Sequence, residues 1–122
     1  MLGDTKENVE MQTNLFLTGK KSGFSSLGWS YETDEERPKT GTLSLLMDWD
    51  GNPQCILETV AVTTLPFRKT TEEFAVQEGF ASLEAWLNTQ WRAFADECKS
   101  LEKKADKGMP IVFEEFHIFH RF

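Results

Sequence analysis

Two apolar runs on either side of a tight-turn sequence constrain the fold more than any other feature of the chain. Residues 43–49 and 54–64 flank Asp50-Gly51-Asn52-Pro53. Glycine and asparagine tolerate positive φ, and proline fixes its own φ, so the sequence predicts a β-hairpin here. The second run is apolar on both of its alternating faces, which predicts a strand covered on both sides.

A helix is predicted before the hairpin. Asp4 and Glu7 have the spacing of a capping box, and Gly19 is a candidate C-cap. Between them one face of the helix is partly apolar and consists of Val9, Gln12, Leu15 and Phe16.

Two more helices are predicted after the hairpin. Thr70 or Thr71 is expected to cap a short helix that ends at Glu78-Gly79. Ser82 is expected to cap a long helix that Gly108 ends. The long helix has an apolar stripe at three- and four-residue steps, formed by Leu83, Trp86, Leu87, Gln90, Trp91, Phe94, Cys98 and Leu101.

Two further strands complete the pattern. From Phe24 to Tyr31 bulky residues alternate with small ones, which is typical of a strand with one nearly bare face. Residues 32–41 are polar and predict an exposed loop, and residues 111–122 predict a final strand opened by Pro110. Few helices and several non-local strands predict an α+β fold, a curved or closed mixed sheet with helices covering its ends.

Composition limits the class of protein. The 122 residues fit one domain, and the net charge of −7 argues against a protein that coats nucleic acid by bulk electrostatics. A pocket that reads one extruded nucleotide remains compatible with this charge. Cys55 and Cys98 lie far apart without a Cys/His cluster, so two buried free thiols are expected and no metal or cofactor is predicted. No apolar run has the length of a membrane span, so we expect a cytoplasmic protein.

Four segments in order are similar to the ASCH domain family. Gly19-Lys20-Lys21-Ser22 resembles the G-x-K-[ST] signature that opens the domain. Residues 37–62 resemble its hairpin, residues 72–94 its Glu-Gly and Ser-Leu-x-x-Trp helical segment, and residues 109–119 its closing strand. The likeness spans roughly residues 3–119, so residues 1–122 are expected to form a single ASCH domain.

The resemblance implies a PUA-like barrel with a cleft between the barrel and its helices. It also implies a function within a range that includes RNA binding, ribonuclease activity and amide hydrolysis of an N4-acylated cytidine. Members of this longer subgroup often carry an additional N-terminal segment before the Gly3-Asp4-Thr5 stretch. This chain is therefore expected to begin short.

The resemblance also supplies catalytic candidates. In the amidohydrolase members a lysine at the place of Lys21 works with a threonine three residues on and a distant glutamate, which Glu78 matches. A desolvated lysine is a base that can activate a hydroxyl, and a glutamate can protonate a leaving amine. Phe24 occupies the place of the hydroxyl, which leaves Ser22 and Ser25 as candidates. On a strand Ser25 points to the face opposite Phe24, whereas Ser22 shares the face of Phe24.

Further residues are candidates for ligand binding. Lys21 is expected to contact a phosphate or a base edge, and Phe24 to line the cleft. Trp29 and Tyr31 predict either base stacking or core packing. Glu58 interrupts an apolar face, and it lies either at the mouth of the cleft or beside a buried donor.

Three functional hypotheses follow. The first is a binding module for single-stranded RNA or a modified nucleoside. The second is a hydrolase, either an amidohydrolase of the N4-acetylcytidine type or a ribonuclease, that uses Lys21 and Glu78. The third is a structural or partner-binding domain whose cleft is filled by its own aromatic side chains.

Overall fold

The computed structural model describes residues 5–122. Its helices and strands follow the chain in the order α1 (Lys6–Leu17), β1 (Gly23–Leu27), β2 (Leu43–Met47), β3 (Pro53–Pro66), α2 (Glu72–Gln77), α3 (Leu83–Ser100) and β4 (Pro110–Arg121). Short 3₁₀ turns follow β1 and β3, and another lies in the loop before β2.

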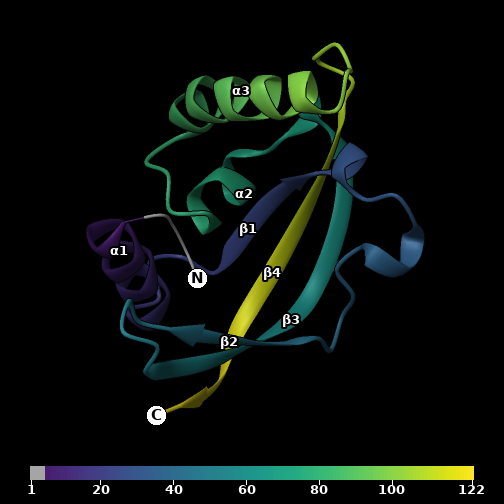
Figure 1. Cartoon of the computed structure of the whole chain (residues 1–122). Helices are drawn as coiled ribbons and strands as arrows, with labels where there is room; N and C mark the ends of the chain where they lie inside the picture. The colour runs from purple at the N-terminus through teal and green to yellow at the C-terminus, as the bar shows by residue number, and fades with distance from the viewer. Residues whose placement is uncertain (1–4) are drawn as a thin grey trace.

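The four strands form one curled sheet in the order β1-β4-β3-β2. All three pairings are antiparallel, so the α+β fold is confirmed, with a sheet of the described residues that is antiparallel rather than mixed. The long strand β3 carries two irregularities against β4, at residues 56–57 and 59–61, and such bulges bend and twist a strand. Figure 1 shows the resulting half-barrel, with α2 and α3 over one end and α1 beside the other.

Two apolar clusters hold the helices on the sheet. The larger cluster lies beneath α2 and α3 and includes Trp86 and Phe94, so these two residues of the predicted apolar stripe face the core. The smaller cluster joins Phe16 of α1 to Leu46, Cys55 and Leu57. Both cysteines are free and buried, as expected, and burial raises the pKa of each thiol.

The predicted strand from Phe24 to Tyr31 is too long. β1 ends at Leu27, and Gly28–Ser30 form a 3₁₀ turn in which Tyr31 N donates to Gly28 O at 3.3 Å. A Cβ on Gly28 would lie 3.0 Å from the side chain of Pro110. The absence of a side chain at Gly28 therefore allows close packing against Pro110 and does not indicate the middle of a strand.

Three predicted details at other elements are also corrected. Thr5 caps α1, since its hydroxyl accepts from Asn8 N at 3.2 Å, and Asp4 lies outside the described residues. The long helix ends at Ser100 rather than at Gly108. The second face of β3 is only partly covered, because Val60 is 44% exposed while Ile56 and Val62 are half-buried. The predicted caps Thr71 and Ser82 are confirmed.

Among residues 5–122, no helix combines the length and apolar character required to cross a membrane.

Candidate functional site

The turn after α1 positions Lys21. Gly19 adopts φ of +77°, and Lys21 N then donates to Leu15 O at 3.0 Å, which brings the chain back along α1. The Lys21 side chain is only 8% exposed. Its Nζ donates to Gln12 Oε1 at 2.8 Å and lies 5.4 Å and 5.7 Å from the ring centroids of Phe16 and Phe24.

The Lys21 amine lies in surroundings that disfavour its charge. Burial lowers the pKa of Lys21 below its ordinary value, because the charged form loses hydration. The Glu78 carboxylate opposes this effect and raises the pKa of the amine. A lysine with a lowered pKa is a better base and nucleophile near neutral pH than a solvated one.

The end of α2 positions Glu78. It is the C-cap residue of α2, and Gly79 follows with φ of +95°. Glu78 is 6% exposed, and four hydrogen bonds satisfy its carboxylate. The donors are Ser25 Oγ at 2.5 Å, Trp86 Nε1 at 2.7 Å, Ser25 N at 3.0 Å and Gln90 Nε2 at 3.3 Å. Glu78 thus connects β1, α2 and α3, which explains how an acid is tolerated at this depth.

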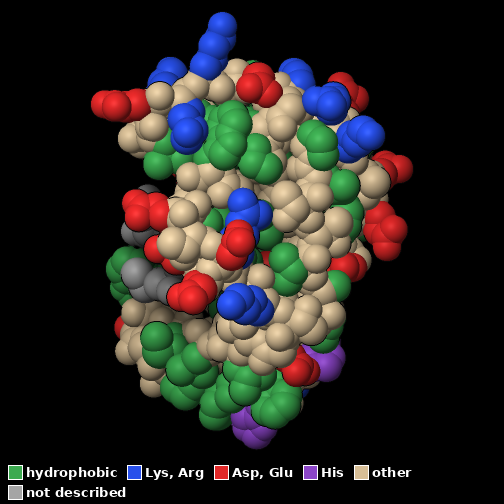
Figure 2. Space-filling view, turned by 90° about the vertical axis from the view of Figure 1, so that its right-hand side faces the viewer, with side chains coloured by type: hydrophobic (Ala, Val, Ile, Leu, Met, Phe, Trp, Pro, Cys, Tyr) green, Lys and Arg blue, Asp and Glu red, His purple; other side chains and the backbone are tan. Residues whose placement is uncertain are grey.

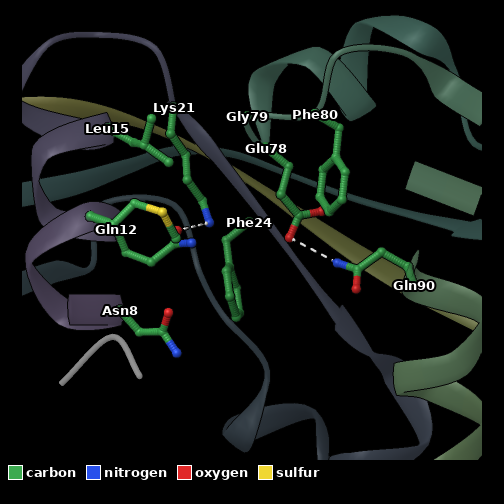
Figure 3. A pocket seen from close by; sticks show the side chains of 10 residues that line it. Asn8, Gln12, Leu15, Lys21, Phe24, Glu78, Gly79, Phe80 and Gln90 are labelled. Atoms are coloured by element: carbon green, nitrogen blue, oxygen red, sulfur yellow. Dashed lines mark hydrogen bonds between the residues drawn. The ribbon is translucent and has the colours of Figure 1, made fainter. Parts of the chain in front are cut away.

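Lys21 and Glu78 line one cavity of about 670 Å³. In Figure 3 both side chains point toward the same hollow, with the Phe24 ring between them. The walls come from α1, β1, the connection between α2 and α3, and α3, and they consist of Asn8, Met11, Gln12, Leu15, Lys21, Phe24, Glu78, Gly79, Phe80 and Gln90. The cavity therefore combines a cation, a carboxylate, three carboxamides and two phenyl rings.

Several of these residues, among them Gln12 and Gln90, were not predicted as site residues. Both had a recognisable signal, because each interrupts an otherwise apolar helical stripe. A carboxamide in such a position needs a polar partner. In the structure Gln12 accepts from Lys21, and Gln90 donates to Glu78. Asn8 and Phe80 carried no comparable signal.

Four predicted site residues lie outside the lining of this cavity. Trp29 packs against the larger core cluster, and Tyr31 Oη lies 2.8 Å from Ser26 Oγ, so neither ring faces the hollow. Glu58 instead pairs with His117, with Oε1 and Nε2 2.6 Å apart. Ser22 lines a smaller apolar cavity of about 230 Å³ beside Phe116.

Ser25 is close to the site but lies behind its wall. It points to the buried side of β1 while Phe24 on the opposite face is 42% exposed, which is the alternation expected from the sequence. Its hydroxyl donates to Glu78 and accepts from Gln90 Nε2 at 3.3 Å. Among the described residues, no hydroxyl side chain lines the cavity, and Lys21 Nζ bonds only to Gln12.

Metal ligands are not gathered anywhere in the described part of the chain, which has no cluster of three or more His, Cys, Asp or Glu side chains. His117 forms a hydrogen bond with Glu58, and the ring of His120 packs edge-on against that of Phe122.

A curled antiparallel half-barrel with a cavity between β1 and its helices, lined by apolar side chains and a few polar groups, defines a small PUA-like domain with a pocket. The chain belongs to the ASCH domain family, whose pattern matches residues 1–120.

Solved structures show the same fold. The chain is 30% identical to an ASCH domain from Lactobacillus crispatus JV V101, with a TM-score of 0.87 over 98% of this chain and 77% of that one. It is 28% identical to a protein from Enterococcus faecalis V583, with a TM-score of 0.85 over 99% and 75% of the two chains. A hypothetical protein at 21% identity, with a TM-score of 0.58 over 96% and 95%, shares the fold alone. No curated protein matches the sequence.

Proposed function

We propose that the cavity binds a single unpaired base, either at an exposed position of single-stranded RNA or in a free modified nucleoside. The observation that carries this proposal is the shared cavity of Lys21 and Glu78, whose volume of about 670 Å³ lies within the usual range of small-molecule sites. Phenyl rings at Phe24 and Phe80 offer flat apolar surfaces for a base. ASCH domains are generally RNA-binding modules, which agrees with this use.

The hydrogen bonds within the wall leave complementary groups free for a ligand. Gln12 Oε1 accepts from Lys21, so the Gln12 amide N–H groups remain as donors. Gln90 Nε2 donates to Glu78 and Ser25, so Gln90 Oε1 remains as an acceptor. Lys21 retains two further N–H donors. A base edge with acceptors facing α1 and a donor facing α3 fits this arrangement, and cytosine presents such an edge whereas uracil does not.

The absence of a hydroxyl from the described lining favours binding over covalent hydrolysis. A serine or threonine nucleophile must lie within hydrogen-bonding reach of its base, and Phe24 occupies the expected position. Hydrolysis by water is the second candidate function. The lowered pKa of Lys21 favours it, because an uncharged amine could accept a proton from a water molecule that attacks the acyl carbon of an N-acylated base. The C–N bond then breaks, and the same proton passes to the departing amine.

Titration of the protein with cytidine, uridine, N4-acetylcytidine and a short single-stranded RNA, followed by NMR, tests both functions. We expect saturable binding of the cytosine compounds and a loss of about tenfold or more in affinity for Lys21→Ala, since a charge-assisted contact contributes about 1.5–3 kcal/mol. Lys20→Ala is the matched control, because Lys20 is an exposed neighbour with the same charge.

Glu78→Gln tests the other side of the cavity. The substitution replaces one carboxylate oxygen by an NH₂ group, which faces the donors that now bond to the carboxylate. We therefore expect weaker ligand binding together with lower thermal stability. Glu73→Gln, at an exposed position of the same helix, is the control. Equal binding by the wild type, Lys21→Ala and Glu78→Gln would refute the site. Release of acetate from N4-acetylcytidine would show that the protein is a hydrolase rather than a binding module.

A further inference from the structure

Of the two edge strands of the sheet, β1 has its open edge covered and β2 does not. The open edge of β1 is covered by the end of α2, since Ser22 N donates to Gln77 O at 2.7 Å and Ser25 N donates to Glu78 Oε2 at 3.0 Å. These bonds satisfy edge groups that would otherwise be free to pair with another chain. β1 is therefore a protected edge.

The open edge of β2 has no such protection among residues 5–122. Thr59 N donates to Thr42 O at 2.9 Å, and in an antiparallel ladder the residues that bond to the partner strand alternate with those that point away. Leu43, Leu45 and Met47 therefore turn their N–H and C=O groups to the open edge. No described backbone or side-chain group outside the strands bonds to them.

The side chains of the same three residues form an exposed apolar row. Leu43 is 51% exposed, Leu45 52% and Met47 38%, and no residue of β2 is charged. Figure 2 shows hydrophobic side chains gathered at the lower end of the molecule, the height at which Figure 1 places β2. Most proteins blunt an edge strand with charges, proline or a bulge. β2 has neither a charge nor a proline, and its irregularity between Leu46 and Met47 lies in the pairing with β3.

We infer that β2 is a dimerisation edge that pairs with β2 of a second copy of this chain. Antiparallel pairing about a two-fold axis at Leu45 places Leu45 opposite the partner's Leu45, and Leu43 opposite the partner's Met47. In this register every outward-facing residue meets an outward-facing residue, so both ladders of N–H and C=O groups are satisfied together. The apolar rows of the two strands then lie side by side on one face of an eight-stranded sheet.

Charge at the two ends of β2 favours this partner. The charged residue nearest the start of the strand is the basic Lys39, and Asp48 and Asp50 follow its end. Antiparallel pairing brings the start of each strand beside the end of the other, so unlike charges approach at both ends. Parallel pairing would place like charges together. A two-fold arrangement uses the same patch on both copies, which is the commonest symmetry of soluble oligomers.

Sedimentation or light scattering of the full chain over a wide concentration range tests the dimer. We expect the mass to rise from monomer to dimer with concentration, and Leu45→Lys to keep the chain monomeric, because the substitution places two lysines opposite each other at the axis. Val76→Lys is the matched control, since Val76 is 49% exposed on α2. Both positions are exposed, so unchanged melting temperatures show that neither variant is unfolded.

A cysteine at the axis tests the register. Leu45→Cys is expected to form an intermolecular disulfide under mild oxidation, since facing residues of such a pair lie about 5.5 Å apart at Cα, within disulfide range. The native Cys55 and Cys98 are fully buried, and Val76→Cys serves as the control for random collision. A monomer at every concentration, or a dimer that Leu45→Lys leaves intact, would overturn the inference.

Discussion

At the scale of single residues, the candidate site depends on two buried charged groups with different support. Four donors satisfy the Glu78 carboxylate, whereas the Lys21 amine has one acceptor and two aromatic neighbours. An acid that is fully hydrogen-bonded costs little to bury, and an amine with free donors remains costly. Lys21 is therefore the residue at which ligand binding and stability are expected to conflict.

Lys21→Met is expected to raise the free energy of unfolding by about 0.5–1 kcal/mol at neutral pH, because it removes a desolvated charge but keeps the apolar stem. The same change is expected to abolish ligand binding. Chemical denaturation of the wild type, Lys21→Met and the exposed control Lys20→Met measures the difference.

The pH dependence of this difference follows from the lowered pKa of Lys21. Below the pKa of the folded state the amine is protonated in both states, and the cost of burying the charge is present in full. Between that pKa and the unfolded value of 10.5 the unfolded chain binds more protons, so wild-type stability rises with pH. The advantage of Lys21→Met should therefore shrink as the pH rises toward 10.5, and an advantage that grows with pH would contradict this account.

At the scale of elements, the junction between α2 and α3 positions three of the ten residues in the cavity wall, Glu78, Gly79 and Phe80. Gly79 ends α2 with φ of +95°, and this conformation directs Glu78 and Phe80 toward the cavity from adjacent positions of the chain. The nearest atoms to a Cβ at Gly79 would be 3.8 Å away, so there is space for a methyl group. The backbone conformation, rather than a steric clash, demands glycine here.

Gly79→Ala is therefore expected to destabilise the protein by about 1–2 kcal/mol through strain at positive φ. Ligand affinity should fall as well, because relief of the strain moves the Glu78 carboxylate. Thermal unfolding and the NMR titration measure the two effects. Gly41→Ala is a control for the strain alone, since Gly41 has φ of +91° in a distant loop with no atom within 4 Å of its Cβ position. Similar losses of affinity in both variants would show that Gly79 has no particular role in the site.

At the scale of the whole molecule, the net charge of −7 limits the ways in which the domain can bind nucleic acid. A protein that follows the phosphate backbone releases many counterions, whereas a pocket for one base releases few. The aromatic and carboxamide lining of the cavity belongs to the second kind of site.

RNA affinity is therefore expected to depend weakly on salt, with a slope of log K against log [salt] shallower than about −1.5, equivalent to one or two phosphate contacts. Oligonucleotides of increasing length should bind with similar affinity once the base and its neighbours are present. A steep salt slope, or affinity that grows steadily with length, would indicate a binding track outside the cavity.

Local patterns of sequence accounted for most elements. The turn at residues 50–53 and the caps Thr71 and Ser82 act within a few residues of themselves, so the hairpin and the helix starts could be read directly. The end of β1 could not be read in this way, because it depends on packing between Gly28 and Pro110, which are distant in the chain.

The family, the α+β class and the candidates Lys21 and Glu78 all followed from the order of residues along the chain. Of the alternatives left open for Trp29, Tyr31 and Glu58, the structure places all three outside the cavity lining, which instead includes Gln12, Phe80 and Gln90. Periodicity shows which side of a helix or strand a residue occupies. It does not show which other element, or which cavity, that side faces. The curl of the sheet and the placement of α1 against α2 and α3 determine that partner, because they bring together groups that are separated by more than fifty residues.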